Sequence, residues 1–183
     1  MFNFNKTNIR DCYEIHTNLF EDIRGRFVKV FHKPEFQAFR LNVDFVEQYY
    51  TISLPGVVRG LHFQLPPHDH AKLVYCVAGE VMDVTLDLRV GSPTYGKHFS
   101  TKLSAKKRNM IYLPSGVAHG FSTINETSIL VYNLTSIHHP ESDTGIFWNS
   151  AEIEWPNSKP IISSRDQNFI KFKDFVSPFR YNS

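Results

Sequence analysis

One strand-like segment, Arg59-Gly-Leu-His62, carries a guanidinium and an imidazole, side chains that can bind an anion and move a proton. Glycine is unfavourable inside a packed strand, so Gly60 indicates a β-bulge or a close approach of the backbone to a ligand. Strict alternation would place Arg59 and His62 on opposite faces of the strand. A bulge at Gly60 would instead turn both toward one cavity, although a strand histidine is also commonly a structural residue.

Three further segments carry polar side chains that could bind a ligand or take part in a reaction. Lys72 begins an apolar strand, where a solvated lysine is the ordinary interpretation. Pro114-Ser-Gly116 is a tight turn that leads to His119, whose small neighbours leave room for a ligand, although a turn histidine can equally bind backbone carbonyls. Arg165-Asp166 lies in a polar loop near the end of the sequence. Residue types alone do not decide between catalytic and structural roles here.

The histidine spacing also permits a metal site. His68-Asp-His70, followed at a distance by His119, is the pattern by which metal-binding cupins hold an ion with three histidines and a glutamate. In this sequence Val74 or Tyr75 stands where that glutamate is expected. The pair His138-His139 is interpreted as a surface pair rather than a ligand set. A metal-dependent cupin therefore stays an alternative, and we expect no metal.

The elements that must position these residues are mostly strands. Apolar and polar side chains alternate from Val81 to Arg89, and turn formers such as Leu54-Pro-Gly56 separate similar runs. Short helices are expected at Pro34–Phe39 and Gln167–Phe175, and the segment after Trp148 is expected to wrap the barrel as a loop. Many short strands at roughly 8–12-residue spacing predict an all-β sandwich or barrel. The other predicted strands are Arg26–Phe31, Phe45–Ser53, Val57–Gln64, Lys72–Ala78, His98–Leu103, Met110–Leu113, His119–Ile124 and Ser128–Thr135.

Composition limits the class of protein. The 183 residues are 42% hydrophobic and 21% charged, which predicts a single folded domain over residues 1–183. The net charge of +2 excludes a polybasic surface, so we expect no nucleic-acid and no membrane partner. The sequence has no long apolar run and no secretory pattern at its start, and Cys12 and Cys76 are too few for a disulfide framework. These features predict a cytoplasmic protein with reduced thiols.

A series of short motifs runs in order along about residues 20–166. The motifs are Asp22-Ile-Arg24-Gly25, Val58-Arg59-Gly-Leu-His-Phe-Gln64, Lys72-Leu-Val74, Val84-Thr-Leu-Asp87-Leu-Arg89, Ser92-Pro-Thr94-Tyr-Gly96, Pro114-Ser-Gly-Val-Ala-His119-Gly-Phe121, Val131-Tyr132, Trp148-Asn149, Glu154-Trp-Pro156 and Arg165-Asp166. In this order they resemble the motifs of the dTDP-4-dehydrorhamnose 3,5-epimerase family of nucleotide-sugar enzymes. The resemblance implies a cupin-type jelly-roll barrel with a few short peripheral helices, followed by a C-terminal tail over residues 167–183.

The resemblance also implies a reaction. The substrate of the family is a nucleoside-diphosphate 4-keto-6-deoxy sugar, whose ketone acidifies the hydrogens on the flanking carbons C3 and C5. A base removes one hydrogen to leave an enolate, and reprotonation from the opposite face inverts that carbon. This chemistry needs a base, an acid and a cation near the enolate oxygen. It implies an isomerase that uses no metal and no redox cofactor.

Four residues match the catalytic positions of the family. His62 matches the base, and Asp166 matches the carboxylate that orients that imidazole and raises its basicity. Tyr132 matches the acid on the opposite face of the sugar, and Lys72 matches the cation near the developing oxyanion. Arginines are expected on the diphosphate and His119 on the sugar. The residues expected to bind substrate are Arg24, Lys29, Glu47, Tyr49, Arg59, His119, Asp143 and Arg165.

Several pocket positions depart from the pattern of the family. Glu47-Gln-Tyr49 stands at a Gln-x-Asn stretch, Lys29 stands at a glutamate, and Asp143 replaces Glu. Ile137-His138 occupies the place of tyrosines that pack against thymine. Since the catalytic groups are kept while these contacts change, we expect the same reaction on a different nucleotide or sugar. A GDP-linked hexose or heptose is the candidate beside a dTDP-linked one.

Two rival classes stay open beside the epimerase. A metal-dependent cupin oxygenase or isomerase would use His68, His70 and His119 but leaves the Arg-Gly-x-His strand unexplained. A non-catalytic sugar-nucleotide-binding cupin would keep the arginines without needing a His–Asp pair that faces a tyrosine. A cupin 3,4-ketoisomerase uses similar chemistry, and the sequence does not fix whether one or two carbons invert. The family is usually dimeric, with the N-terminal segment adding to the sheet and pocket of the partner, so we expect a homodimer.

Overall fold

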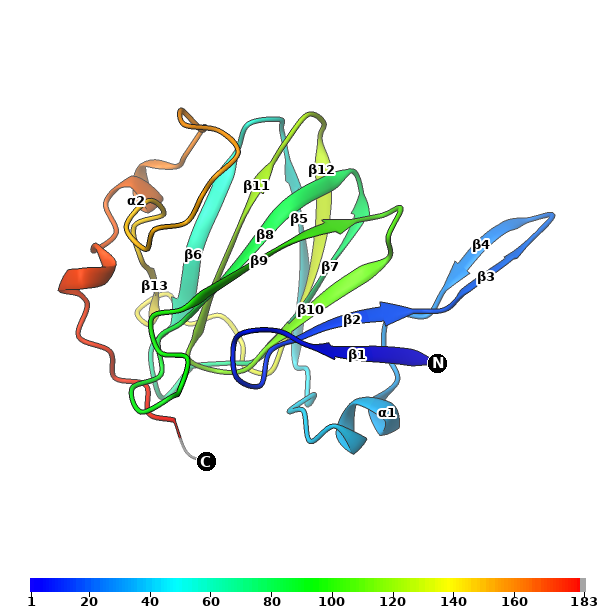
Figure 1. The fold of residues 1–183 in the computed structure, drawn as a ribbon, viewed down its shortest axis with the longest axis horizontal. Helices are drawn as coiled ribbons and strands as arrows, with labels where there is room; N and C mark the ends of the chain where they lie inside the picture. Colours follow the sequence, from blue (N-terminus) through cyan, green and yellow to red (C-terminus); the bar gives the residue numbers. More distant parts are fainter. Residues whose placement is uncertain (182–183) are drawn as a thin grey trace.

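Two antiparallel sheets face each other as a jelly-roll barrel in this computed structural model, which describes residues 1–181 (Figure 1). The six-stranded sheet contains, in spatial order, β1 (Phe2–Lys6), β2 (Tyr13–Thr17), β10 (Asn109–Leu113), β7 (Lys72–Ala78), β12 (Ser128–Leu134) and β5 (Glu47–Ser53). The five-stranded sheet contains β13 (Asp143–Gly145), β6 (Val58–Gln64), β11 (Val117–Thr123), β8 (Glu80–Asp87) and β9 (His98–Ser104). The predicted all-β, cupin-type barrel is confirmed.

A two-stranded hairpin and three short helical elements lie at the periphery. The hairpin, β3 (Leu19–Asp22) and β4 (Gly25–Val28), projects away from the barrel (Figure 1). Helix α1 (Lys33–Ala38) agrees with the prediction at 34–39. Helix α2 (Ser164–Gln167) and the 3₁₀ turn η1 (Phe172–Asp174) belong to the C-terminal segment. The longest of these elements has six residues, so no helix within residues 1–181 could span a membrane.

The short helix expected at Gln167–Phe175 is confirmed only in part, because η1 supplies a single helical turn inside that range. Helix α2 ends at the first residue of that range, and Ile170 forms a parallel bridge with the residue that follows β13. Phe172 and Phe175 pack against the apolar cluster outside the five-stranded sheet. Contacts with the barrel therefore override local helix propensity. Residues 182–183, the end of the predicted tail, lie outside the described residues.

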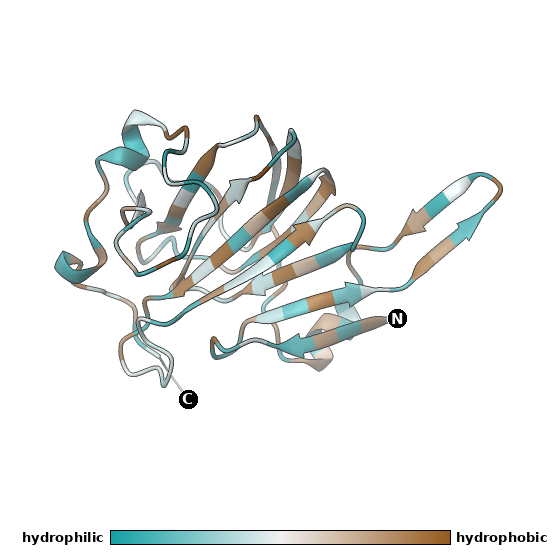
Figure 2. Cartoon of the chain, turned by 45° about the horizontal axis from the view of Figure 1, so that its top comes forward, coloured by the Kyte–Doolittle hydropathy of each residue, from teal (hydrophilic) through white to brown (hydrophobic). Residues whose placement is uncertain are grey.

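Strand β8 shows how the sheet separates the barrel interior from the outer packing. Val84 and Leu86 belong to an apolar cluster outside the five-stranded sheet, which the C-terminal segment covers through Phe179. Asp83 and Thr85 point the opposite way and are buried. The predicted alternation is confirmed, and Figure 2 shows it as changing colour along the strands. The polar face is the one that turns inward, where it lies beside the interior histidine of β11.

The N-terminal segment, expected from the family to add to a partner, pairs within its own chain. Strand β1 lies along β2, which in turn pairs with β10. Phe2 and Phe4 pack edge-on against Phe36 of α1, with ring centroids 5.2 and 5.1 Å apart. This aromatic cluster covers the outer face of the six-stranded sheet beside Ile15 and Met110.

Candidate active site

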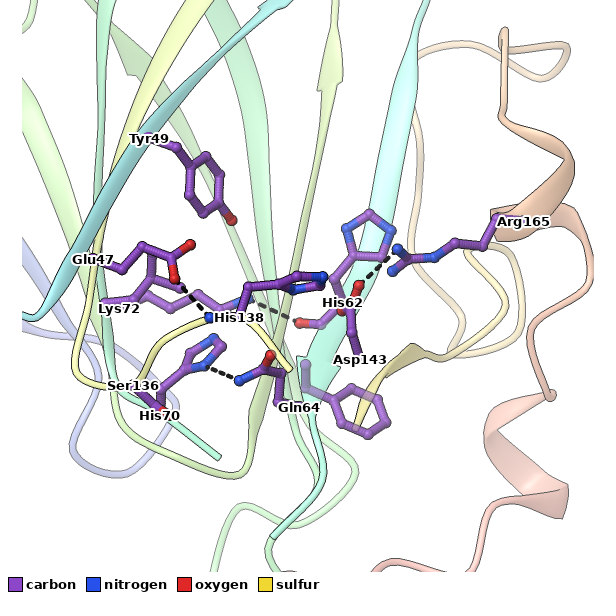
Figure 3. Close-up of a pocket in the computed structure, with 12 residues that line it drawn as sticks. Glu47, Tyr49, His62, Gln64, His70, Lys72, Ser136, His138, Asp143 and Arg165 are labelled. Carbon is purple, nitrogen blue, oxygen red and sulfur yellow. Dashed lines mark hydrogen bonds and ion pairs between the residues drawn. The ribbon is translucent and has the colours of Figure 1, made fainter. Parts of the chain in front are cut away.

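One end of the barrel opens into a cavity of about 370 Å³ between β5, β6 and β7 (Figure 3). Antiparallel pairing aligns the strand ends there, because Leu134 lies opposite Glu47 on one side and Lys72 on the other. Six of the residues predicted from the sequence to form the site line this cavity, namely Glu47, Tyr49, His62, Lys72, Asp143 and Arg165.

His62 is held by a carboxylate that comes 104 residues later in the chain. Its Nε2 lies 2.9 Å from Oδ2 of Asp166. Ser163 caps the N-terminus of α2, where its hydroxyl accepts a hydrogen bond from the backbone N–H of Asp166 at 3.1 Å and fixes the position of that residue. Oδ2 of Asp166 also accepts from the N–H of Gly60 at 3.0 Å. The carboxylate therefore joins α2 to β6 and orients the imidazole between them.

This pairing decides which nitrogen of His62 can act as a base. An ionised carboxylate only accepts hydrogen bonds, so Nε2 carries the hydrogen and Nδ1 is the basic nitrogen. Burial lowers the pKa of His62, although Asp166 pulls it upward. Burial opposes ionisation of Asp166, yet the hydrogen bonds from His62, Gly60 and Ser163 hold its pKa below the ordinary value. A neutral imidazole beside a carboxylate is the state that general-base catalysis requires.

A bulge in β6 brings the two polar side chains of the Arg-Gly-x-His segment to one face. His62 lies opposite His119 on β11, whereas Arg59 lies opposite Phe121, so three steps on β6 span two on β11. Both residues therefore pair with inward-facing residues of β11, but only His62 lines the cavity. Arg59 is exposed, so the hypothesis that a bulge turns both side chains toward one cavity is confirmed for His62 alone. Gly60 has φ of +133°, and a Cβ there would lie 2.5 Å from the backbone of β11. Glycine is required at this crossing.

Lys72 places a buried cation next to the base. Its Nζ donates to the backbone carbonyl of His62 at 3.2 Å, and the residue is 5% exposed. Burial lowers the pKa of Lys72 to about 8, while Asp143 and Asp83 act in the opposite direction. Lys72 is therefore mostly protonated at neutral pH, and its ammonium faces the cavity (Figure 3). A solvated strand-end lysine is therefore excluded.

The sheet opposite His62 contributes a wall of stacked rings. Tyr132 on β12 stacks on Tyr49 with centroids 4.8 Å apart, and its ring meets His119 edge-on at 5.8 Å. Nε2 of His119 lies 2.7 Å from Oδ2 of Asp83. Burial raises the pKa of Tyr132, so its phenol stays protonated. Tyr49 lines the cavity, and Tyr132, which lies directly opposite it on the neighbouring strand, stacks against its ring.

Charged groups at the rim are already paired. Nη1 of Arg165 lies 2.7 Å from Oδ2 of Asp143. Glu47 accepts a hydrogen bond from the backbone N–H of His138 at 2.6 Å. Arg59 lies outside the cavity lining and donates from Nε to the Ser53 hydroxyl at 2.9 Å. These contacts hold the rim side chains in fixed positions around the base.

Sequence reasoning missed several residues that line the cavity. Gln64 lies two residues after His62 on the same strand face, so period-2 alternation could have placed it there. His70 had been considered as a metal ligand, and His138 as a departure from the family. Both lie outside the strands, where periodicity gives no direction. The remaining unpredicted lining residues are Phe63, Leu134 and Ser136.

Two predicted substrate-binding residues lie away from the cavity of their own chain. Arg24 sits at the turn of the β3–β4 hairpin, 86% exposed, with Nη2 lying 2.6 Å from Oδ2 of Asp22. Lys29 follows β4, and its carbonyl accepts from the hydroxyl of Thr17 at 2.8 Å. Neither residue lines the cavity, because the hairpin extends outward from the barrel (Figure 1).

The three histidines of a cupin metal site do not come together within residues 1–181. Nδ1 of His70 lies 3.2 Å from Nε2 of Gln64, and His119 is bonded to an aspartate on β8. His68 stacks on His139 instead. The metal-dependent alternative therefore lacks its ligand set at this site.

Comparison with known proteins assigns the family. The family model described as dTDP-4-dehydrorhamnose 3,5-epimerase matches residues 6–174. The chain belongs to this family. It is 40% identical over 172 residues to the dTDP-4-dehydrorhamnose 3,5-epimerase of Shigella flexneri, covering 92% of this chain and 95% of that protein. It is 37% identical to the dTDP-4-dehydrorhamnose 3-epimerase of Streptomyces niveus, covering 88% and 80%.

A solved structure agrees with this assignment. The 3,5-epimerase of Legionella pneumophila in complex with dTDP-4-keto-L-rhamnose superposes with a TM-score of 0.94 at 30% identity, and the match covers 100% of both chains. The resemblance predicted from the motifs is confirmed, and it extends beyond residues 20–166 at both ends. The predicted isomerase class is confirmed with it.

Proposed function

We propose that this epimerase inverts C3, C5 or both on a nucleoside-diphosphate-linked 4-keto-6-deoxy sugar, with His62 as base. The observation that carries the proposal is the His62–Asp166 pair, 2.9 Å apart, in a cavity that also holds the Lys72 ammonium. A binding module without catalysis has no need for an imidazole oriented in this way. The names of the relatives, which are 3,5- and 3-epimerases of dTDP sugars, support the same reaction.

The first half of the reaction follows from the pair. Nδ1 of His62 takes the hydrogen from a carbon next to the ketone, and the electron pair moves into the enolate. Lys72 stabilises the oxyanion, a contribution of about 3 kcal/mol for one preorganised donor. Asp166 stabilises the imidazolium that forms, as the carboxylate does in other His–Asp pairs.

The second half needs a donor on the other face of the ring. Tyr132 comes from the sheet opposite His62 and stays protonated, which suits a general acid. Tyr49 stacks on Tyr132 and lines the cavity, so the two phenols must be distinguished. We expect Tyr132→Phe to abolish inversion, while His62 continues to exchange the substrate hydrogen with solvent. Tyr49→Phe should keep inversion.

Hydrogen exchange in heavy water tests the proposal. Incubation with a nucleotide-linked 4-keto-6-deoxy sugar should place deuterium at each inverted carbon, read separately for C3 and C5 by NMR. His62→Asn should abolish exchange by removing the base but leave ligand binding intact, since the amide keeps a similar volume. Exchange at neither carbon by the wild type would eliminate the epimerase function for that substrate. Turnover by His62→Asn would eliminate the proposed base.

The nucleotide is a separate question. The departures from the family at Glu47, Tyr49, Asp143 and His138 all fall on the cavity lining, where they can contact substrate. We therefore predict that the substrate differs from that of the dTDP relatives in its nucleobase or in its sugar. Ranking dTDP, UDP and GDP by the thermal shift that each produces tests this prediction. A clear preference for dTDP would contradict a change of nucleobase.

We also propose that the protein functions as a homodimer. Tyr50, Ile52 and Val77 leave an exposed apolar area on the outer face of the six-stranded sheet. The hairpin exposes Phe20 and Ile23 and carries Arg24 away from its own cavity. A second copy that covers the apolar area and receives the hairpin would give Arg24 a diphosphate to bind, as the family resemblance predicted.

A further inference from the structure

Two histidine motifs that the reaction does not use meet beside the cavity. His68 lies in the segment after β6, and His139 lies in the segment after β12. Their rings stack with centroids 3.4 Å apart and an interplanar angle of 16°. Because the two come from distant parts of the chain, neither motif predicted the other as its neighbour.

Glu141 brings a carboxylate to the same place. Its Oε1 lies 3.3 Å from Nδ1 of His139 and 4.0 Å from Nε2 of His68. One ligand atom from each residue lies within 4.8 Å of the others.

A buried glutamine holds the two histidine-bearing segments in register. Nε2 of Gln64 donates to the carbonyl of His68 at 2.7 Å, and its Oε1 accepts from the N–H of His139 at 2.6 Å. The carbonyl of His139 accepts from the N–H groups of Ser142 and Asp143, each at 3.0 Å. Ligands on a backbone fixed in this way lose little freedom on binding.

We propose that His68, His139 and Glu141 form a binding site for a divalent transition-metal ion of the zinc class on the outer side of the cavity wall. Two imidazoles and a carboxylate are ligands that Zn²⁺ accepts, and three protein ligands leave a fourth position for water. Because the two rings stack with planes 16° apart, one ring must turn out of the stack to direct its nitrogen at the ion. The ion links the segment after β6 to the segment that carries the cavity residues His138 and Asp143. It supports this wall, and no step of the epimerisation passes through it.

Calorimetric titration of Zn²⁺ into the chelator-treated full-length protein tests the site. We expect one ion per chain, and His68→Ala and His139→Ala should each weaken binding by more than about 100-fold, since loss of an outer-shell partner alone costs about 10- to 100-fold. His32→Ala is the matched control, because Nδ1 of His32 lies 3.1 Å from Oε1 of Glu35 in a pair with one histidine and one carboxylate. This control should bind Zn²⁺ as the wild type does. At a hundredfold excess over Kd, Zn²⁺ should raise Tm by about 5–10 °C.

Three outcomes would overturn the proposal: absence of Zn²⁺ binding, binding that survives both alanine variants, and binding lost in His138→Ala but kept in His68→Ala. The last would move the ion into the cavity. Glu141→Gln provides a variant whose fold is not at risk, because that side chain is 68% exposed, and it too should weaken binding. The metal-free Tm of each variant separates a lost ligand from a lost fold, and the binding readout is independent of epimerase activity.

Discussion

His62 and Lys72 are buried in one cavity, and their titrations act on the reaction in opposite ways. Burial lowers the pKa of His62 below 6.5 and that of Lys72 to about 8. His62 accepts a proton only when neutral, so the rate falls as the pH drops through a value below 6.5. Lys72 stabilises the enolate only when protonated, so the rate falls as the pH rises through about 8. We expect a bell-shaped dependence of kcat/KM on pH, measured on the free enzyme and substrate.

The alkaline side of this profile has a specific control. Lys72→Met should lower kcat/KM by about 100- to 1000-fold and remove the fall near the pKa of the lysine. Burial raises the pKa of Tyr132, so ionisation of that phenol lies at higher pH and does not produce the same fall. An alkaline fall at unchanged pH in Lys72→Met would contradict the role of the lysine.

At this scale the sequence predicted residue types better than contacts. His62 and Lys72 were placed at the site by their ordered motifs, and both line the cavity. Pairing of Asp166 with His62 came from the family resemblance, since no periodicity connects residues 104 apart. The position of Tyr132 at the substrate stays a prediction, and the structure adds that its ring stacks on Tyr49, which lines the cavity. That stack depends on the register between β5 and β12, which local sequence does not specify.

The crossing of β6 and β11 is the element on which the site depends. Gly60 combines φ of +133° with a Cβ position 2.5 Å from a backbone atom of β11. Gly60→Ala should therefore lower the free energy of unfolding by the backbone strain, about 1–3 kcal/mol, and by a steric cost in addition. Urea denaturation measures the sum.

Gly91→Ala separates the two contributions. Gly91 has φ of +90°, and a Cβ built there meets no heavy atom within 4 Å. This variant should show the backbone strain alone. An equal loss of stability in both variants would mean that close packing of β6 on β11 adds nothing, and would contradict the steric requirement for glycine.

Elements were predictable in proportion to their length and alternation. Strands β5 to β12 follow the predicted runs within a few residues, because these runs are rich in β-branched and aromatic residues or alternate with period 2, and turn formers bound most of them. Strands β1 and β2 were missed, since their polar residues, such as Asn3, Asn5 and His16, weaken the apolar signal. Strand β13 has three residues and forms only through its pairing with β6. Pairing with Gln64 brings Asp143 to the cavity, and local sequence could not predict this pairing.

For the molecule as a whole, we propose that the chain folds as one unit. Three apolar clusters share the same two sheets: one lies between them, and the other two cover the outer faces. The N-terminal segment covers one outer face and the C-terminal segment covers the other. Because both ends of the chain complete the same barrel, trimming either segment exposes core and should reduce stability.

The proposed exchange of hairpins between copies makes the final prediction. Arg24 would serve the cavity of the partner, whereas His62 and Arg59 serve their own chain. Separately, His62→Asn and Arg24→Ala should each lose activity. Mixed in equal amounts and allowed to exchange subunits, they should recover about a quarter of the wild-type activity, because half of the dimers are mixed and each mixed dimer holds one site with both native residues.

A second mixture shows whether the recovery comes from hairpin exchange. Arg59 and His62 lie on the same strand, so His62→Asn mixed with Arg59→Ala should recover nothing. Sedimentation equilibrium of the wild type must show a dimer for either result to apply. A monomer, or failure of the first mixture to recover activity, would place Arg24 outside the site and limit the cavity to the residues of one chain. Recovery in both mixtures would instead indicate exchange of more than the hairpin, since Arg59 belongs to the barrel itself.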